Sequence, residues 1–253
     1  MDRTFVNIGF KDIGTALLDI AMPRRCVVCG RTLMLRERFI CPGCLLEMPM
    51  TRFWMRPHNP MADRFNERIQ ETISAYEPYS YAVALFRYNA ESGYRNICRH
   101  LKYGHGIESG RYFSDMLGSY LASSAEFADV DVVIPVPLHW TRRWKRGYNQ
   151  SQVIAERLAA ALGVELETHA LVRSRRTRTQ TKLSVEKKTA NVKGAFRTTS
   201  SSRERLASCR HVLLVDDTFT TGATLNACCT GLRAVLPPGT RISVATLAFV
   251  SSD

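Results

Sequence analysis

The stretch from Val212 to Leu225, which reads VLLVDDTFTTGATL, constrains the fold of this chain more than any other part of the sequence. It begins with a short aliphatic run, which is typical of a strand covered on both faces of a parallel sheet. Two adjacent acids, Asp216 and Asp217, come next, and a run of threonine and glycine then opens a helix near Thr224. A strand, a polar loop and a helix in this order predict one unit of an α/β fold, with the loop at the carboxyl edge of the sheet.

The same order of elements occurs earlier in the chain. An aliphatic run at residues 132–136 predicts a strand, and a helix is expected over residues 151–162, with Asn149 or Ser151 as its cap and Gly163 at its end. The same patterns predict strands at residues 80–88 and 242–250 and a helix at residues 111–121. The sequence therefore predicts a doubly wound α/β fold with a mostly parallel sheet.

The threonine-rich loop has the chemistry of a sugar-phosphate site. Gly222 allows the backbone to approach an anion, and N–H groups at a helix start bind phosphate together with threonine hydroxyls. Carboxylates beside such a loop would repel phosphate, so the two acids are expected to face ribose hydroxyls or a divalent cation. The residues expected to bind this ligand are Asp216, Asp217, Thr218, Thr220, Thr221, Gly222, Ala223 and Thr224. The alternative is a strand-to-helix turn in which the acids only cap the helix.

Residues 212–225 resemble the signature of type I phosphoribosyltransferases, in which two acids contact the ribose hydroxyls and the threonine-rich loop holds the 5-phosphate. That resemblance implies a catalytic role for Asp216 and Asp217, with a Mg²⁺ complex of phosphoribosyl pyrophosphate as the ligand. Other segments resemble the ComF family of competence-associated, phosphoribosyltransferase-like proteins: IPVPL at 134–138, RGYNQ at 146–150, QTKLS at 180–184 and NVKGAF at 191–196. ComF proteins also begin with a cysteine-rich module, so the resemblance extends over residues 22–250.

The ComF resemblance also places a pyrophosphate-binding loop at residues 137–146. The basic residues expected to bind the anion are Arg142, Arg143, Lys145, Arg146 and Lys188. At Lys188 the family commonly carries arginine, and lysine keeps the charge but loses the bidentate fork. The basic segment at residues 173–197 is expected to cover the ligand, and a nucleic-acid contact or a solvated basic surface is the alternative.

For three further side chains the sequence allows two roles each. Trp140 and Trp144 lie among the arginines, where they are expected to anchor the loop to the fold, with base stacking as the alternative. Lys102 is expected at the surface, with contact to the ligand as the alternative. No Ser-His-Asp arrangement is recognisable in the sequence, which argues against a covalent hydrolase.

Two Cys-x-x-Cys pairs near the N-terminus contain Cys26, Cys29, Cys41 and Cys44. Four thiolates with no open position predict a structural, tetrahedral Zn²⁺ site, and a redox or iron–sulfur role is the alternative. A short helix at residues 11–21 is expected to precede this module. The predicted organisation is an N-terminal helix and zinc module at residues 1–60, a connector without clear periodicity, and a phosphoribosyltransferase-like domain at residues 75–253.

The net charge of +12 and a pI near 9.6 give a surface that attracts phosphates, nucleic acids or acidic lipids. The sequence contains neither a run of about 18 apolar residues nor an N-terminal signal pattern, so a cytoplasmic location without a membrane span is expected. Three functions fit these features. One is an enzyme that transfers phosphoribose to an unidentified acceptor, and another is a sensor that binds the ligand without turnover. The third, which the ComF resemblance implies, is an accessory protein of DNA uptake that holds single-stranded DNA and contacts DNA-uptake proteins.

Overall fold

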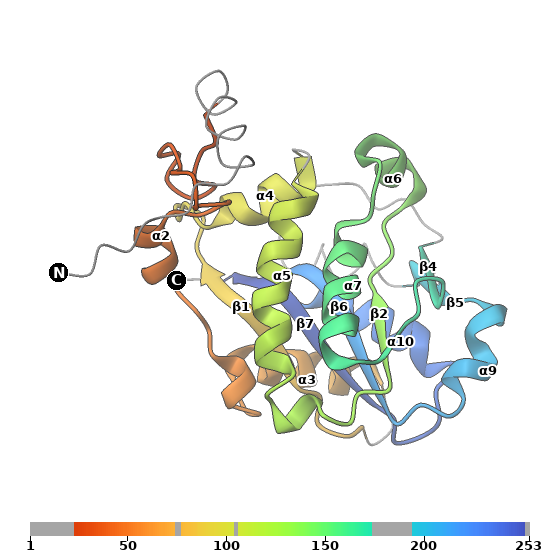
Figure 1. Cartoon of the computed structure of the whole chain (residues 1–253). Helices are drawn as coiled ribbons and strands as arrows, with labels where there is room; N and C mark the ends of the chain where they lie inside the picture. The colour runs from red at the N-terminus through yellow and green to blue at the C-terminus, as the bar shows by residue number, and fades with distance from the viewer. Residues whose placement is uncertain (1–22, 74–76, 104–105, 174–193, 251–253) are drawn as a thin grey trace.

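The computed structural model describes residues 23–73, 77–103, 106–173 and 194–250 of the chain. Its centre is a parallel sheet in the order β1-β7-β6-β2-β3 (Figure 1). The strands of this sheet are β1 (Ala82–Tyr88), β2 (Val132–Pro135), β3 (Glu165–Leu166), β6 (His211–Phe219) and β7 (Arg241–Val250). The predicted mostly parallel α/β sheet is therefore confirmed.

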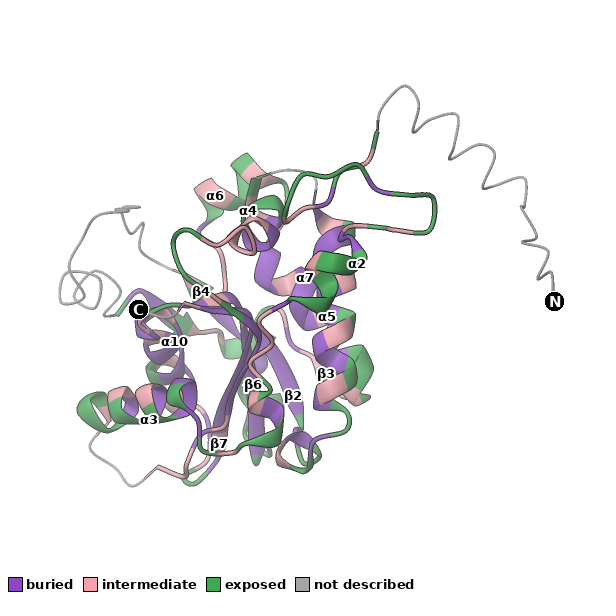
Figure 2. Cartoon of the chain, turned by 90° about the vertical axis from the view of Figure 1, so that its left-hand side faces the viewer, coloured by how far each residue is buried: buried purple, intermediate pink, exposed green. Residues whose placement is uncertain are grey.

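Both faces of the sheet are covered, because side chains along each strand alternate between two hydrophobic cores. On β6, Leu213 and Val215 join one core, whereas Val212 and Leu214 join the other. The first core includes helices α4 (Arg95–Tyr103), α5 (Ile107–Leu121) and α7 (Gln150–Leu162), and the second includes α3 (Pro60–Thr72) and α10 (Ala223–Arg233). Figure 2 shows the buried strands between these two layers of helices.

The order of the strands places a topological switch point between β2 and β6. From β2 the chain passes through α7 to β3 on one side, and from β6 it passes through α10 to β7 on the other side. The two crossover helices therefore lie on opposite faces of the sheet. In open α/β sheets, ligands bind at the carboxyl ends of the strands at such a point.

Strand β6 is longer than the sequence predicted. The aliphatic run ends at Val215, but pairing with β7 continues to Phe219, opposite Phe249. Pairing with β2 ends at Val215, opposite Pro135. Within the described residues, the last part of β6, including both acids, is thus held by β7 on one side and has no strand on the other, where a cavity opens.

Helix α7 agrees with its predicted signals. The Asn149 side chain accepts a hydrogen bond from the N–H of Ser151 at 3.2 Å, and Gly163 ends the helix in the left-handed conformation. In contrast, the expected connector between the zinc module and the sheet contains helix α3. Met61, Phe65 and Ile69 recur every four residues and are fully or almost fully buried, a spacing that polar residues between them obscured.

The N-terminal module comprises the cysteine turns and α2 (Pro42–Leu46), and its buried Leu33 and Ile40 join the first core. The boundary between residues 60 and 75 stays a prediction, although α3 packs with the sheet. The other short elements are β4 (Leu171–Arg173) and β5 (Phe196–Thr198), α6 (Trp140–Arg146), α9 (Arg203–Leu206), η1 (Phe53–Met55), η2 (Ala125–Phe127) and η3 (Ser200–Ser202). The helix expected at residues 11–21 lies outside the described residues. Within the described ranges, no helix has the length and apolarity to cross a bilayer.

Candidate functional site

A cavity of about 330 Å³ lies at the carboxyl ends of β2 and β6, at the switch point of the sheet. It is bounded by the end of β6, the N-terminus of α7, the segment that contains α6, and the C-terminal end of α4. Its lining residues are Tyr88, Lys102, Tyr103, Val136, Pro137, Leu138, Arg142, Arg146, Asn149, Gln150, Ser151, Arg173, Asp216, Asp217, Thr218, Thr220 and Thr224. The structure thus brings together the two acids, part of the threonine loop and part of the predicted arginine group.

Asp216 is fixed from two directions. Its Oδ1 atom accepts a hydrogen bond from Ser151 Oγ at 2.8 Å and another from the N–H of Asp217 at 2.9 Å. Burial raises the pKa of Asp216 to about 6, and the neighbouring carboxylate of Asp217 adds to this shift. The carboxyl group is therefore held in one orientation and gains its charge close to neutral pH.

Asp217 is more deeply buried, with 4% of its surface exposed. Its Oδ1 lies 3.1 Å from Lys102 Nζ, and its main-chain carbonyl accepts a weak hydrogen bond from the Cys98 thiol at 3.7 Å. Burial alone would lower the pKa of Lys102, but the attraction of Asp217 raises it above its ordinary value. Among the described residues, the Oδ2 atom of Asp217 has no hydrogen-bond partner. A buried carboxylate oxygen left in this way indicates a missing ligand, water or cation.

Three arginines, Arg142, Arg146 and Arg173, line the same cavity as the acids. Arg146 donates to Gln150 Oε1 at 2.9 Å and its guanidinium lies 5.0 Å from the centre of the Tyr103 ring. Burial, and then the nearby charge of Arg142, lowers the pKa of Arg173. Positive charges gathered in one cavity favour an anion between them. The part of the cavity that the arginines line is therefore suited to a polyanion.

The threonine loop turns sharply into α10. Gly222 has a φ of 73°, and a Cβ atom there would lie 2.9 Å from the Phe219 ring, so only glycine fits. Thr218, Thr220 and Thr224 line the cavity. The remaining predicted residues of this loop, Thr221, Gly222 and Ala223, do not line it, and their role in binding stays a prediction.

The predicted anion-binding residues do not all line the cavity, and Lys145 on α6 is one that does not. Arg143 is exposed on α6 and does not line it, because successive helical residues point in different directions. Lys188 lies outside the described residues, as does most of the segment at 173–197. The ends of that segment are held in the antiparallel pair β4–β5, which places Arg173 at the cavity.

Sequence reasoning assigned the wrong role to the tryptophans of α6. Trp140 and Trp144 are 72% and 84% exposed and lie one helical turn apart, so they do not anchor the loop. His139 does so instead: it is buried, and its Nδ1 accepts a hydrogen bond from the N–H of Thr141 at the start of α6. Helix α6 projects from the body of the molecule (Figure 1).

Sequence reasoning also missed Ser151 and Arg173 as site residues. It did not decide whether Lys102 lies at the surface or reaches the ligand. Ser151 was considered only as a helix cap, and Arg173 only as part of a basic segment. One signal for Ser151 was available, because it directly follows the RGYNQ segment that resembles ComF. The contact of Lys102 with Asp217 joins α4 to β6 and carries no local sequence signal.

A Ser-His-Asp arrangement does occur within the part of the chain that the structure describes. Buried His211 lies 2.6 Å from Asp129 through Nδ1 and 2.8 Å from Ser243 through Nε2. Ser243 Oγ is fully buried and also accepts a hydrogen bond from the N–H of Tyr81. No substrate can reach this hydroxyl, so the group is a structural link between β6 and β7, far from the carboxyl ends of the strands.

The four predicted zinc ligands converge. The sulfur atoms of Cys26, Cys29, Cys41 and Cys44 all lie within 4.8 Å of one another, and the sulfurs of Cys29 and Cys41 are 3.9 Å apart. A tetrahedral site with Zn–S bonds of about 2.3 Å has sulfur atoms about 3.8 Å apart, so the group fits Zn²⁺. The N–H of Cys44 is the main cause that lowers the pKa of Cys41 to about 6, which favours the thiolate.

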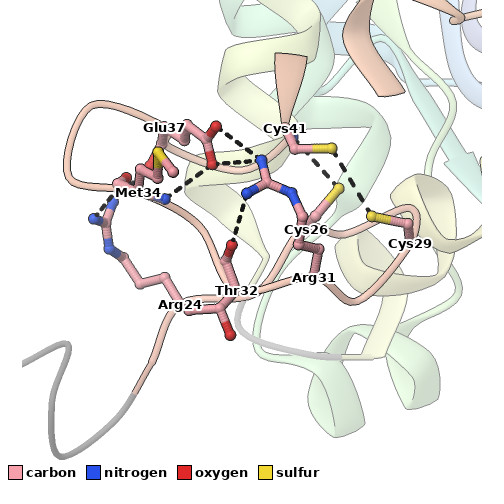
Figure 3. A network of polar contacts seen from close by, with 8 residues as sticks. All are labelled: Arg24, Cys26, Cys29, Arg31, Thr32, Met34, Glu37 and Cys41. Atoms are coloured by element: carbon pink, nitrogen blue, oxygen red, sulfur yellow. Dashed lines mark hydrogen bonds and ion pairs between the residues drawn. The ribbon is translucent and has the colours of Figure 1, made fainter. Parts of the chain in front are cut away.

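A second layer of contacts orders the loop around these thiolates (Figure 3). Arg31 forms an ion pair with Glu37 at 2.8 Å, and the Glu37 carboxylate also accepts from the N–H of Met34 at 2.9 Å. Arg24 donates to the main-chain carbonyl of Glu37 at 2.7 Å. The N–H of Cys41 points at the sulfur of Cys26 at 3.4 Å. Such outer contacts fix the orientation of the ligating thiolates.

Comparison with known proteins agrees with this geometry. Residues 149–253 match the family model of the phosphoribosyl transferase domain. The chain is 40% identical over 96 residues to competence protein F of Haemophilus influenzae, covering 38% of this chain and 41% of that protein. It is 30% identical over 121 residues to competence protein ComFC of Bacillus subtilis, covering 48% of this chain and 45% of that protein. The predicted resemblance to the ComF family is confirmed.

A third relative is DNA utilization protein YhgH of Escherichia coli K12, which is 38% identical over 95 residues, with 38% of this chain and 40% of that protein covered. The chain thus matches less than half the length of these relatives. Among solved structures, glutamine phosphoribosylpyrophosphate amidotransferase of B. subtilis gives a TM-score of 0.38 at 22% identity, over 58% of this chain and 30% of that chain. The matched domain and the observed topology together confirm the predicted fold class: a phosphoribosyltransferase-like α/β domain with an N-terminal four-cysteine module.

Proposed function

We propose that this ComF-type chain binds a Mg²⁺ complex of phosphoribosyl pyrophosphate in the cavity between β2 and β6. The observation that supports this most strongly is the division of the cavity by charge, with two acids on β6 and three arginines on the other elements. A ligand that carries a diol at one end and phosphates at the other matches both halves. A simple nucleotide-phosphate loop would not need adjacent carboxylates.

Each part of the cavity has a role in this proposal. Asp216, held by Ser151, accepts hydrogen bonds from the ribose hydroxyls, and Asp217 supports it from the buried side. The threonine loop and the N-terminus of α10 hold the 5-phosphate. Arg142, Arg146 and Arg173 bind the pyrophosphate. The unpartnered oxygen of Asp217 and the partly exposed carboxyl group of Asp216 are oxygen donors of the kind that Mg²⁺ prefers.

The same arrangement suits transfer of the phosphoribosyl group. When the bond between the anomeric carbon and pyrophosphate breaks, positive charge grows on the ring and negative charge on the leaving group. The acids lie on the side where positive charge develops and the arginines on the side where negative charge develops, which stabilises both. Mg²⁺, when bound to the pyrophosphate, neutralises part of the leaving charge.

Calorimetry with phosphoribosyl pyrophosphate and Mg²⁺ tests the binding. We expect saturable binding by the wild-type protein and a loss of at least about tenfold in affinity for Asp216→Asn/Asp217→Asn, because charged hydrogen-bond acceptors contribute roughly 1.5–3 kcal/mol. Absence of heat with the wild-type protein, or equal affinity of the double variant, would contradict the proposal. Release of pyrophosphate on addition of nucleobases or amines separates an enzyme from a sensor.

The exposed tryptophans favour a second function, contact with single-stranded DNA during DNA uptake. Trp140 and Trp144 lie on α6 beside basic residues and are exposed aromatic side chains of the kind on which bases stack. The names of the relatives, competence protein and DNA utilization protein, point to the same process. We expect DNA affinity to fall as salt rises, and Trp140→Ala and Trp144→Ala to lose about 1–3 kcal/mol each. Affinity that is independent of salt and of both tryptophans would exclude this role.

A further inference from the structure

The two acids of the cavity are not equivalent. Asp216 is partly exposed to the cavity and is held by a neutral donor, Ser151. Asp217 has 6% of its side chain exposed and pairs with the ammonium group of Lys102 at 3.1 Å. The difference follows from the neighbouring helices, because Asp217 meets Lys102 at the end of α4, whereas Asp216 meets Ser151 in the first turn of α7.

The position of Lys102 in the fold keeps its ammonium group next to Asp217. It lies in the last turn of α4, which is anchored in the first core by the buried Ile97 and Leu101. Its side chain is 26% exposed, so it is neither a free surface lysine nor fully removed from the cavity. The attraction of Asp217 also keeps its pKa above the ordinary value, so the ammonium is charged at every physiological pH.

We propose that Lys102 is the resident counterion of Asp217 and keeps divalent cations off the acid pair of the ligand-free protein. Two adjacent carboxylates alone are a donor set for Mg²⁺ or Mn²⁺. An ammonium group already at Asp217 repels a second cation at the same oxygens, and the three arginines of the cavity add to this repulsion. If the proposed function holds, the metal enters the cavity only together with its polyphosphate ligand.

Lys102→Met tests this in the zinc-loaded, full-length protein without any sugar phosphate. Mn²⁺ is the probe, and the free ion is counted by electron paramagnetic resonance. We expect Lys102→Met to bind Mn²⁺ at least about tenfold more tightly than the wild-type protein, because a positive charge that repels the ion from within 4 Å of the site has been removed. Lys102→Arg should behave as the wild type. The gain should disappear in Lys102→Met/Asp217→Asn.

Lys145→Met is the matched control, because it removes the same charge from an exposed position on α6 outside the cavity. Its Mn²⁺ titration should superimpose on that of the wild type. Equal Mn²⁺ affinity for the wild type and Lys102→Met would overturn the proposal, as would an equal gain in Lys145→Met. If Lys102→Met does not fold, the wild type is compared with Asp217→Asn: identical titrations support the proposal, and an Mn²⁺ site lost in Asp217→Asn overturns it.

This result is independent of the proposed function, since the titration contains no phosphoribosyl ligand. A protein that failed to bind phosphoribosyl pyrophosphate in calorimetry would still show whether Lys102 excludes the metal. Conversely, tight binding of phosphoribosyl pyrophosphate together with an Mn²⁺ site in the ligand-free wild type would leave the proposed function intact and remove the role of Lys102.

Discussion

Ser151 Oγ donates a 2.8 Å hydrogen bond to Asp216 Oδ1 and thereby joins the first turn of α7 to the end of β6. The two residues belong to two separate strand-loop-helix units of the chain. Their contact crosses the switch point of the sheet, where β2 and β6 stop pairing. This hydrogen bond fixes the orientation of the carboxyl group that faces the cavity.

We expect Ser151→Ala to weaken binding of phosphoribosyl pyrophosphate about threefold to tenfold, which corresponds to the typical 0.5–1.5 kcal/mol of one hydrogen bond. The pKa of Asp216 should rise further, because a donor to its ionised form has been removed. Calorimetry at several pH values measures both effects. Ser119→Ala, which removes an exposed hydroxyl from α5, is the control and should bind as the wild type.

The pH dependence of binding follows from the raised pKa of Asp216, about 6 against an ordinary 3.8. The ionised form accepts the ribose hydroxyls, so affinity should be level at pH 7–8 and fall up to about tenfold per pH unit below pH 6. In the ligand-free protein, the free energy of unfolding changes with pH in the opposite direction to the ligand affinity. The folded state binds this proton more tightly than the unfolded state, so this group adds stability as the pH falls from 7 towards 4. Asp216→Asn should retain only the titration of the ligand itself, and an equally steep profile in this variant would contradict the assignment.

Gly222→Ala should destabilise the protein and impair ligand binding together. The left-handed conformation costs a residue with a side chain about 1–2 kcal/mol, and the new Cβ would also lie 2.9 Å from the Phe219 ring. Gly239 has a φ of 81° with open space around it, so Gly239→Ala should show only the first effect. Chemical denaturation of both variants separates the conformational cost from the clash. Gly222→Ala with the stability of Gly239→Ala and unchanged affinity would show that the tight turn is not needed.

Removal of zinc should destabilise more than the N-terminal module. Leu33 and Ile40 lie between the cysteine pairs and pack in the same core as β1 and α5. We therefore expect one equivalent of zinc per chain and a lower midpoint of thermal unfolding for the whole protein after treatment with a chelator. Cys41→Ser should lose the metal. Cys209→Ser, outside the cluster, should keep it, and an unchanged unfolding midpoint after complete zinc loss would contradict the shared core.

Much of the fold could be predicted from the sequence because its signals are local. The aliphatic runs of β2 and β6, the cap of α7 at Asn149 and the cysteine pairs each occupy a few consecutive residues. Helix α3 escaped prediction because only Met61, Phe65 and Ile69 of its apolar face stand out among polar residues. The tryptophans of α6 were misjudged because composition does not show whether a short helix packs against the fold or projects from it.

By itself, the sequence determined that two acids and a threonine-glycine turn follow a buried strand, and that four cysteines with the spacing of a metal site stand in two pairs. Each of these depends on neighbours in the chain, which steric rules and hydrogen bonding arrange without help from distant segments. Only the tertiary structure decided that Lys102 and Ser151 reach different acids, that Arg173 rather than Arg143 joins the cavity, and that Asp217 keeps an unpartnered oxygen. Those contacts depend on how helices pack on the two faces of the sheet, and packing is a property of the whole core.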